Sequence, residues 1–203
     1  MSVDPLAAIY DEFARTYDDN RGLFDMRPVI ADFMAHLPAT GNLLDLGCGA
    51  GEPFAKAFLD RGWSVTGVDF SARMLELAAR YVPGMTRVHG DMRAVDFPAA
   101  SFDAACAVYS LFHVPHALHP GLFSRVRSWL RPGGTFLFTY ATRAYTGQER
   151  FDGTKEFLGQ RLFYSHVTPE ELRRQLGDAG FASVEAEQRS IGGEEFLWIT
   201  ARV

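Results

Sequence analysis

Apolar residues recur along this chain in two alternating patterns. Short runs rich in Val, Leu and Ala predict buried strands, and stretches with apolar residues three and four positions apart predict helices. Strands are expected at 42–46, 64–68, 85–89, 104–108 and 135–140, with helices between them at 54–59, 71–81 and 118–130. Alternation of this kind predicts a parallel sheet that is covered by helices on both faces.

Two further helices are predicted before the first strand. Asp4-Pro5 is a favourable helix start, because a capping carboxylate precedes a proline at the first helical position. The apolar face that follows has helical spacing and is partly aromatic, with Leu6, Ile9, Tyr10, Phe13 and Tyr17. A second helix is expected at 24–37, where Pro38 ends it.

The last third of the chain carries a polar segment and a hairpin pattern. Residues 146–160 are polar and contain glycines, which favours a variable loop, and residues 161–166 are extended and aromatic. The segment 168–171 is a capping box that begins another helix. Two strand-like segments, 181–190 and 196–203, flank a pair of glycines, so we expect the last strand to be antiparallel.

Composition favours one domain, residues 1–203, with a full core. The chain has 203 residues, of which 47% are hydrophobic and 22% are charged, and its net charge of −5 argues against a nucleic-acid surface. Its start lacks an apolar signal core, and no stretch is apolar enough to cross a bilayer. Cys48 and Cys106 form neither a disulfide framework nor a metal pattern. We therefore expect a cytoplasmic protein that binds no metal, membrane or nucleic acid.

The first predicted strand ends in a glycine turn. Gly47, Gly49 and Gly51 occupy alternate positions, and a helix can begin at Pro53, as in nucleotide-binding strand–helix junctions. The glycines are expected to let the backbone approach a ligand, with free N–H groups of the helix start facing it. The dinucleotide fingerprint requires glycine where Glu52 stands, and no Gly-Lys-Ser/Thr phosphate loop follows. With Asp45 close by, the turn favours a cationic ligand over an anion.

The segment 44–51, with the sequence LDLGCGAG, resembles motif I of the class I S-adenosylmethionine-dependent methyltransferases, whose cofactor carries an ammonium and a sulfonium. The resemblance extends from about residue 6 to the end. It implies a seven-stranded, doubly wound, Rossmann-like sheet that is mostly parallel with an antiparallel last strand. It also implies that helices in residues 1–38 cover a core of residues 39–203. An ordinary glycine turn between a strand and a helix is the alternative.

Two acidic residues beyond the glycine turn support the resemblance. Asp69 ends a strand about twenty residues later, where a carboxylate binds ribose hydroxyls, although it would also serve as a charge before the next helix. Gly90-Asp91-Met92 resembles the family's adenine-binding motif, although surface turns also use Gly-Asp. The resemblance implies that S-adenosylmethionine, and its product S-adenosylhomocysteine, would contact Tyr17, Asp45, Gly47, Cys48, Gly49, Gly51, Asp69, Phe70, Asp91, Met92 and Tyr109.

The loop 109–115 follows the fourth strand, so it is expected to face the methyl group of the cofactor. It lacks the Asn/Asp/Ser-Pro-Pro-aromatic motif of relatives that methylate DNA bases. His113 is a candidate catalytic base near neutral pH, together with Tyr109, and a structural histidine is the alternative. Substrate contacts are expected from Tyr10, Arg21, His113, Tyr140, Arg143 and Tyr164.

These motifs predict methyl transfer to a nitrogen, oxygen or sulfur atom of a small molecule, by a monomer or homodimer. The lack of a large insertion favours a small acceptor over a macromolecule, but the three kinds of nucleophile are not separated by the sequence. Two alternatives remain open. One is a nucleoside-binding relative that transfers no methyl group and has an accessory or sensing role. The other is a nicotinamide-dependent oxidoreductase, which Glu52 disfavours.

Overall fold

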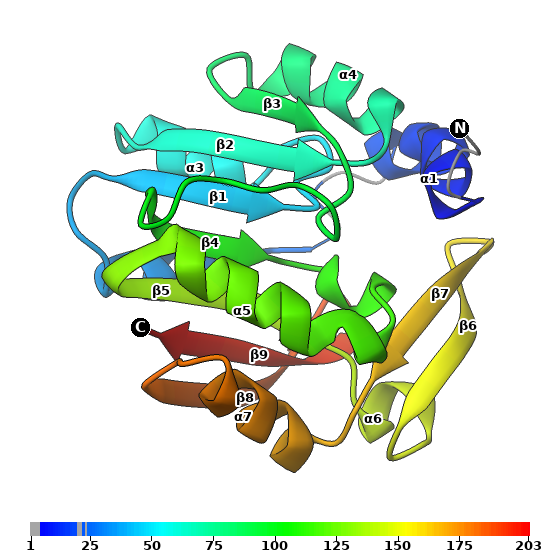
Figure 1. Ribbon diagram of the computed structural model, residues 1–203. Coiled ribbons are helices and arrows are strands. Elements are labelled where there is room, and N and C mark those ends of the chain that lie inside the picture. Colours follow the sequence, from blue (N-terminus) through cyan, green and yellow to red (C-terminus); the bar gives the residue numbers. More distant parts are fainter. Residues whose placement is uncertain (1–4, 20–21, 23) are drawn as a thin grey trace.

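The computed structural model of the chain describes residues 5–19, 22 and 24–203. A seven-stranded sheet runs through its centre (Figure 1). Nothing is described of the side chains of residues 5–7. The strand order is β3-β2-β1-β4-β5-β9-β8. The strands are β1 (Asn42–Leu46), β2 (Ser64–Asp69), β3 (Thr86–His89), β4 (Phe102–Ala107), β5 (Leu130–Tyr140), β8 (Ser183–Ile191) and β9 (Glu194–Arg202).

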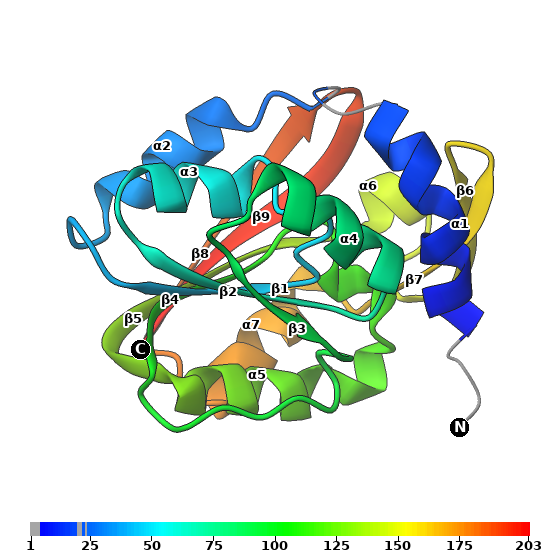
Figure 2. The ribbon, with the colours of Figure 1, turned by 90° about the horizontal axis from the view of Figure 1, so that it is seen from above.

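Helices cover both faces of this sheet (Figure 2). Helices α2, α3 and α4 lie on one face, and α5 and α7 lie on the other. Each layer has its own apolar cluster against the sheet. Within the described ranges, no helix combines the length and the apolarity that a membrane crossing requires. The helices are α1 (Pro5–Asp19), α2 (Arg27–Ala35), α3 (Phe54–Asp60), α4 (Ala72–Tyr81), α5 (His119–Trp129), α6 (Arg143–Thr146) and α7 (Pro169–Asp178), with short 3-10 turns η1 (Leu111–His113) and η2 (His116–Leu118).

The chain order of the strands places a switch point between β1 and β4. Strand β1 pairs in parallel with both β2 and β4. The strands β2 and β3 lie on one side of β1, and the later strands β4, β5, β9 and β8 lie on the other side. Strand β9 is antiparallel to both β5 and β8. The predicted seven-stranded sheet with an antiparallel last strand is therefore confirmed. In sheets of this kind, ligands bind beyond the carboxyl ends of the strands at the switch point.

The segment predicted as a variable loop, 146–160, instead contributes a strand, and that prediction was wrong. Strand β6 (Phe151–Phe157) pairs with β7 (Gln160–His166) as a separate two-stranded antiparallel sheet. The connecting residues Leu158 and Gly159 both have positive φ, 47° and 77°, which suits the tight turn of a hairpin. Exposure alternates along β6, as in a strand with one face covered.

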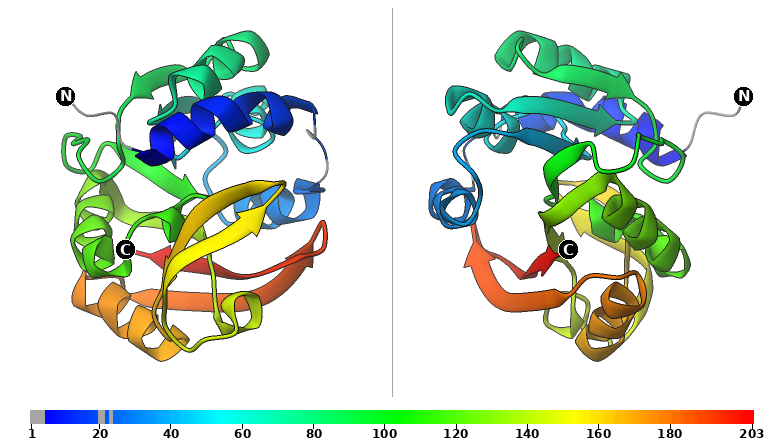
Figure 3. Two further views of the ribbon diagram at one scale, coloured as in Figure 1. Left: turned by 90° about the vertical axis from the view of Figure 1, so that its right-hand side faces the viewer. Right: turned by 60° about the vertical axis from the view of Figure 1, so that its left-hand side comes forward.

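Helix α1 crosses the end of the main sheet beside this hairpin (Figure 3). It contacts both α4 and β7. The Asp11 carboxylate of α1 accepts hydrogen bonds from the Ser71 hydroxyl at 2.6 Å and from the Arg73 N–H at 3.1 Å, both at the start of α4. The Tyr81 hydroxyl donates to Asp18 at 2.8 Å. These bonds hold α1 over the carboxyl ends of the strands.

Helix α2 begins at Arg27, three residues after the predicted start at Phe24. Pro28 stands in the first turn, where its missing N–H leaves no backbone donor unpaired. The preceding Asp25 accepts a hydrogen bond from the Arg27 N–H at 3.1 Å. Phe24 therefore lies outside the helix, and its ring packs 5.5 Å from the Tyr109 ring.

Candidate active site

A cavity of about 670 Å³ opens at the carboxyl ends of the strands, beneath α1. This volume lies within the usual range of small-molecule sites. One part of its wall is acidic and comes from the glycine turn and the residues that follow β2 and β3. Another part is aromatic and comes from α1, η1, β7 and β9. The two parts belong to one continuous space.

The glycine turn is shaped by close packing. Gly47, Gly49 and Gly51 have φ values of 74°, 52° and 80°, which L side chains rarely adopt. A Cβ on Gly47 would lie 2.3 Å from the Ser110 Cβ, and a Cβ on Gly51 would lie 2.9 Å from Val82. A Cβ on Gly49 would meet no atom within 4 Å. Gly49 therefore borders the open cavity, whereas the other two glycines permit contact with neighbouring protein.

Three backbone N–H groups of the turn are engaged within the protein. Gly47 and Cys48 both donate to the Val68 carbonyl oxygen, at 2.7 Å and 3.0 Å, and Gly49 donates to Asp69 Oδ2 at 2.8 Å. The end of the adjacent strand β2 supplies both acceptors, which the sequence of the turn alone does not reveal. These three N–H groups therefore already have acceptors, and the turn presents an open surface to the cavity at Gly49.

Asp69 lies at the end of β2 in the cavity wall, as predicted. Its Oδ1 accepts from the Ser71 N–H and its Oδ2 accepts from the Gly49 N–H, both at 2.8 Å. Each oxygen keeps a second lone pair that can accept a ligand hydroxyl. Burial raises the pKa of Asp69 to about 6, against the opposing effect of the two backbone hydrogen bonds. The carboxyl group is thus held in place and partly protonated in mildly acidic solution.

Asp45 is a second buried carboxyl group in the same wall. The Cys106 thiol donates to its Oδ1 at 3.2 Å. Burial raises the pKa of Asp45 to about 7, and Asp69 contributes in the same direction. Burial also raises the pKa of the Cys48 thiol, which is therefore not an activated nucleophile. Ionising both carboxyl groups in this buried wall is unfavourable because their negative charges repel. A positively charged ligand would offset that repulsion, so the wall suits a cation.

Three other predicted cofactor residues meet at this acidic part of the wall. Met92 is buried, and its methyl carbon lies 3.3 Å from where a Cβ of Gly47 would be. Asp91 Oδ1 and Oδ2 accept from the backbone N–H and the Nε of Arg93, each at 2.7 Å. The Phe70 ring also lines the cavity. The structure thus brings the residues after β2 and β3 together beside the glycine turn.

Tyr109 follows β4 with φ of 54°, a strained value for a residue with a side chain. Such strain costs about 1–3 kcal/mol and is concentrated at functional sites. The Tyr109 N–H donates to Thr139 Oγ1 at 2.7 Å, and its ring packs 5.4 Å from the Phe196 ring. Its hydroxyl is buried and has no hydrogen-bond partner among the described residues. The backbone therefore turns this side chain into the wall of the cavity.

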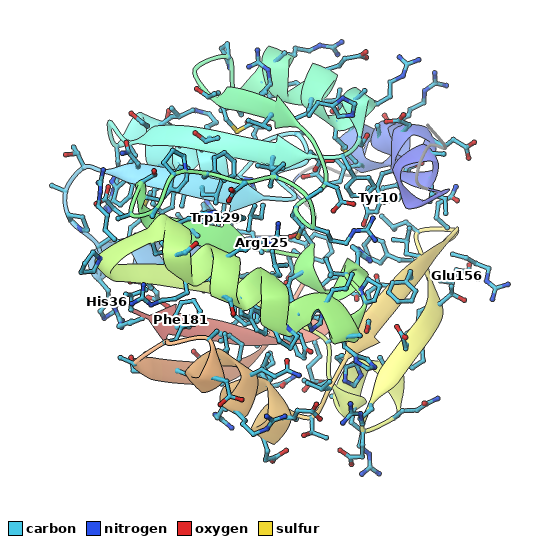
Figure 4. The ribbon with its side chains drawn as sticks, in the orientation of Figure 1. Tyr10, His36, Arg125, Trp129, Glu156 and Phe181 are labelled. Atoms are coloured by element: carbon cyan, nitrogen blue, oxygen red, sulfur yellow. The ribbon has the colours of Figure 1, made fainter. Side chains whose placement is uncertain are left out.

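His113 is buried in η1 and is held at both ring nitrogens. Its Nδ1 lies 2.5 Å from the Phe163 carbonyl oxygen, so Nδ1 carries the proton and donates. Its Nε2 accepts from the Tyr10 hydroxyl at 2.7 Å. Tyr10 belongs to α1, and its side chain lies on the side of that helix that faces the strand ends (Figure 4). Burial lowers the pKa of His113 to about 4, although the bond to Phe163 opposes this shift. Burial disfavours the imidazolium, so this environment weakens the predicted base and favours the alternative of a structural histidine.

The predicted substrate residues are only partly brought together. Tyr10 and Tyr164 line the cavity, as does Tyr17, predicted for the cofactor. Tyr140 and Arg143 do not belong to its wall, so the structure does not bring them to this cavity. Tyr140 is fully buried, with its hydroxyl 3.0 Å from His119 Nδ1, and Arg143 is exposed in an ion pair with Glu149. A strand buried on both faces gives no sign of which side chains face the site. Arg21 lies outside the described residues.

The sequence prediction missed several wall residues, chiefly Glu194 and Phe196 at the start of β9. Because β9 is antiparallel to β5, its first residues lie where the parallel strands end. The hairpin pattern had already implied this direction, so the residues after Gly193 were detectable as site candidates. Ser110 and Phe112 also line the cavity, from the loop that the prediction assigned to the site.

Comparison with known proteins agrees with this geometry. A family model described as a methyltransferase domain matches residues 17–186. The chain is 26% identical over 182 residues to phosphoethanolamine N-methyltransferase of Plasmodium falciparum, covering 88% of this chain and 66% of that protein. It is 34% identical over 100 residues to sterol 24-C-methyltransferase of Yarrowia lipolytica, covering 46% of this chain and 26% of that protein. The chain thus spans less than two thirds of either relative.

Two solved structures have the same architecture. The 1,6-didemethyltoxoflavin-N1-methyltransferase of Burkholderia thailandensis, with bound 1,6-didemethyltoxoflavin and S-adenosylhomocysteine, has 26% sequence identity and a TM-score of 0.71, covering 100% of this chain and 90% of that one. An S-adenosylmethionine-dependent methyltransferase of Mesorhizobium loti shares the fold with 24% identity and a TM-score of 0.72, over 88% of this chain and 97% of that one. Neither finding supports the nicotinamide-dependent alternative. The chain therefore belongs to the S-adenosylmethionine-dependent methyltransferase family.

Proposed function

We propose that this chain transfers a methyl group from S-adenosylmethionine to a nitrogen, oxygen or sulfur atom of a small molecule. The main support is that one cavity contains both an acidic wall beside the glycine turn and an aromatic wall beneath α1. A donor and an acceptor would need such adjacent compartments in order to react. The enclosed position of the cavity beneath α1 favours an acceptor of small size.

The residues present fit the cofactor. Asp69 offers two carboxylate oxygens to the ribose hydroxyls, and Asp91 with Met92 offers a polar group and an apolar surface to the adenine. Asp45 offers a buried carboxyl group to the cationic part, and Gly49 leaves its side of the wall open. The bound cofactor supplies a methyl group on an electron-poor sulfonium. The protein has chiefly to align the acceptor, and good alignment contributes about 7–11 kcal/mol to lowering a barrier.

We propose that His113 positions the acceptor and acts only weakly as a base. At neutral pH its imidazole is uncharged, with Nδ1 donating to Phe163 and Nε2 accepting from Tyr10. A group with a pKa of about 4 removes protons poorly from a neutral alcohol or ammonium. An acceptor whose lone pair is already free, such as a neutral amine, therefore fits this site best. Tyr109, whose buried hydroxyl is unpartnered among the described residues, is the second candidate for contact with the acceptor.

A nucleoside-binding role without methyl transfer is the alternative. Incubation of the protein with methyl-labelled S-adenosylmethionine and fractionated metabolite pools separates the two. The proposed function predicts that label passes to a small molecule, and that calorimetry detects S-adenosylhomocysteine binding in the same preparation. Binding without label transfer to any fraction would indicate the accessory role. Failure to bind either nucleoside would contradict the proposal altogether.

A further inference from the structure

The aromatic wall of the cavity is built from packed rings of η1, β7 and β9 and of the turn after β4. The Phe112 ring stacks on Phe196 at 4.9 Å and on Tyr164 at 5.1 Å. The Tyr109 ring meets Phe196 edge to face at 5.4 Å. Because neighbouring rings hold one another in place, this part of the cavity is a preformed surface for an apolar or aromatic group.

A carboxylate stands at the edge of these rings. Glu194 begins β9 and lines the cavity, and its Oε2 is buried with no hydrogen-bond partner among the described residues. The Tyr109 hydroxyl in the same wall is also without a partner there. A buried carboxylate oxygen that lacks a donor is unfavourable, and native structures contain few of them. The Tyr145 hydroxyl interacts with the Glu194 side chain, and a ligand that brings an N–H or O–H donor to the unpartnered Oε2 would complete the arrangement.

The charges of the wall disfavour an anionic ligand. Each described cation that lines the cavity already pairs with a carboxylate: Arg27 with Asp25, Lys56 with Asp60, and Arg93 with Asp91. Lys155, near the aromatic wall, donates to the Tyr145 carbonyl oxygen and lies over the Tyr145 ring. A phosphate or carboxylate on the acceptor would therefore meet Glu194 without a compensating cation from these residues. A positively charged or N–H-bearing group would meet both the carboxylate and the faces of the rings.

We propose that the acceptor is a small amine with an apolar or aromatic body, and that the Glu194 carboxylate selects it by accepting a hydrogen bond from its amino group. The proposal rests on the proposed methyl transfer and names the substrate class of the same site. It assigns recognition to Glu194, whichever nucleophile of the acceptor receives the methyl group. Phe112, Tyr164 and Phe196 enclose the body of the molecule.

Two probes of matched shape test this assignment. Protein saturated with S-adenosylhomocysteine is titrated by calorimetry with 2-phenylethylamine and, separately, with 2-phenylethanol. One charge-assisted hydrogen bond predicts that the amine binds about ten to a hundred times more tightly than the alcohol. Glu194→Gln should abolish that preference, because the amide is uncharged. Glu195→Gln removes the adjacent, exposed carboxylate and should retain the preference.

The outcomes are separable. Three results with the wild-type protein alone would overturn the assignment: equal affinity for the two probes, preference for the alcohol, or no binding of the amine. An amine preference that survives in Glu194→Gln would remove Glu194 from the recognition site. The affinity for S-adenosylhomocysteine is measured first in every preparation. If the proposed function fails, the wild-type protein does not bind this nucleoside. Retained nucleoside binding without amine preference contradicts only the present inference.

Discussion

Affinity for S-adenosylhomocysteine should depend on pH through the buried carboxyl group of Asp69. Its pKa is raised to about 6 in the free protein, so the group is mostly protonated at pH 5 and mostly ionised at pH 7. Only the ionised group accepts from both ribose hydroxyls while keeping its bonds to Gly49 and Ser71. Binding must therefore release a proton, and affinity must fall as the pH is lowered.

The size of the effect follows from the pKa. With a value of about 6, the ionised fraction of Asp69 falls about tenfold between pH 7 and pH 5, so the Kd should rise about tenfold. If the Asp45 carboxyl, whose pKa is about 7, must also ionise, the Kd rises by a further factor of about fifty. His113, whose pKa is about 4, stays largely neutral over this range.

Calorimetric titrations at pH 5, 6 and 7, in buffers with different ionisation enthalpies, measure both the Kd and the protons released. Asp45→Asn should leave only the tenfold dependence of Asp69. Asp60→Asn, which removes an exposed carboxylate paired with Lys56, should behave as the wild type. A Kd that differs by less than twofold between pH 5 and pH 7, with no proton release at pH 6, would refute the assignment of Asp69 to the ribose.

Three further predictions concern packing and positioning. Gly47→Ala should lower the free energy of unfolding by about 2–4 kcal/mol in urea titrations, because left-handed strain adds to a clash with Ser110. Gly49→Ala should lose only about 1 kcal/mol and instead weaken S-adenosylhomocysteine binding; equal loss of stability in the two variants would contradict this reasoning. Phe123→Ala, at a fully buried ring, should cost about 3–5 kcal/mol by the same assay, and a loss below 1 kcal/mol would contradict its place in the core. Tyr10→Phe removes the donor to His113 and should lower turnover more than nucleoside affinity; unchanged turnover would leave the pair without a role in positioning.

Local sequence patterns determined most of the architecture. The parallel strands and the helices between them follow from periodic apolar positions, because each element buries one stripe or both faces against its neighbours. The glycines at 47, 49 and 51 indicated a turn after β1, and in the structure all three have positive φ. The capping box at 168–171 predicted the start of α7, where the Glu171 N–H donates to the Thr168 hydroxyl. These signals lie within a few residues of the feature they specify, so they can be read without knowing the fold.

Only the tertiary structure decided which side chains share the site and how they titrate. Strand β6 has polar residues between Phe151 and Phe157, and its pairing with β7 cannot be predicted from either segment alone. Tyr140 ends β5, a strand that is buried on both faces. The alternation of the strand therefore does not show whether the Tyr140 side chain faces the cavity or the core, and the packing of the neighbouring elements decides it. The lowered pKa of His113 and the raised pKa of Asp69 arise from burial, which the whole fold imposes. Glu194 is brought to the cavity by an antiparallel strand from the end of the chain, because long-range pairing, not local pattern, sets where its carboxylate lies.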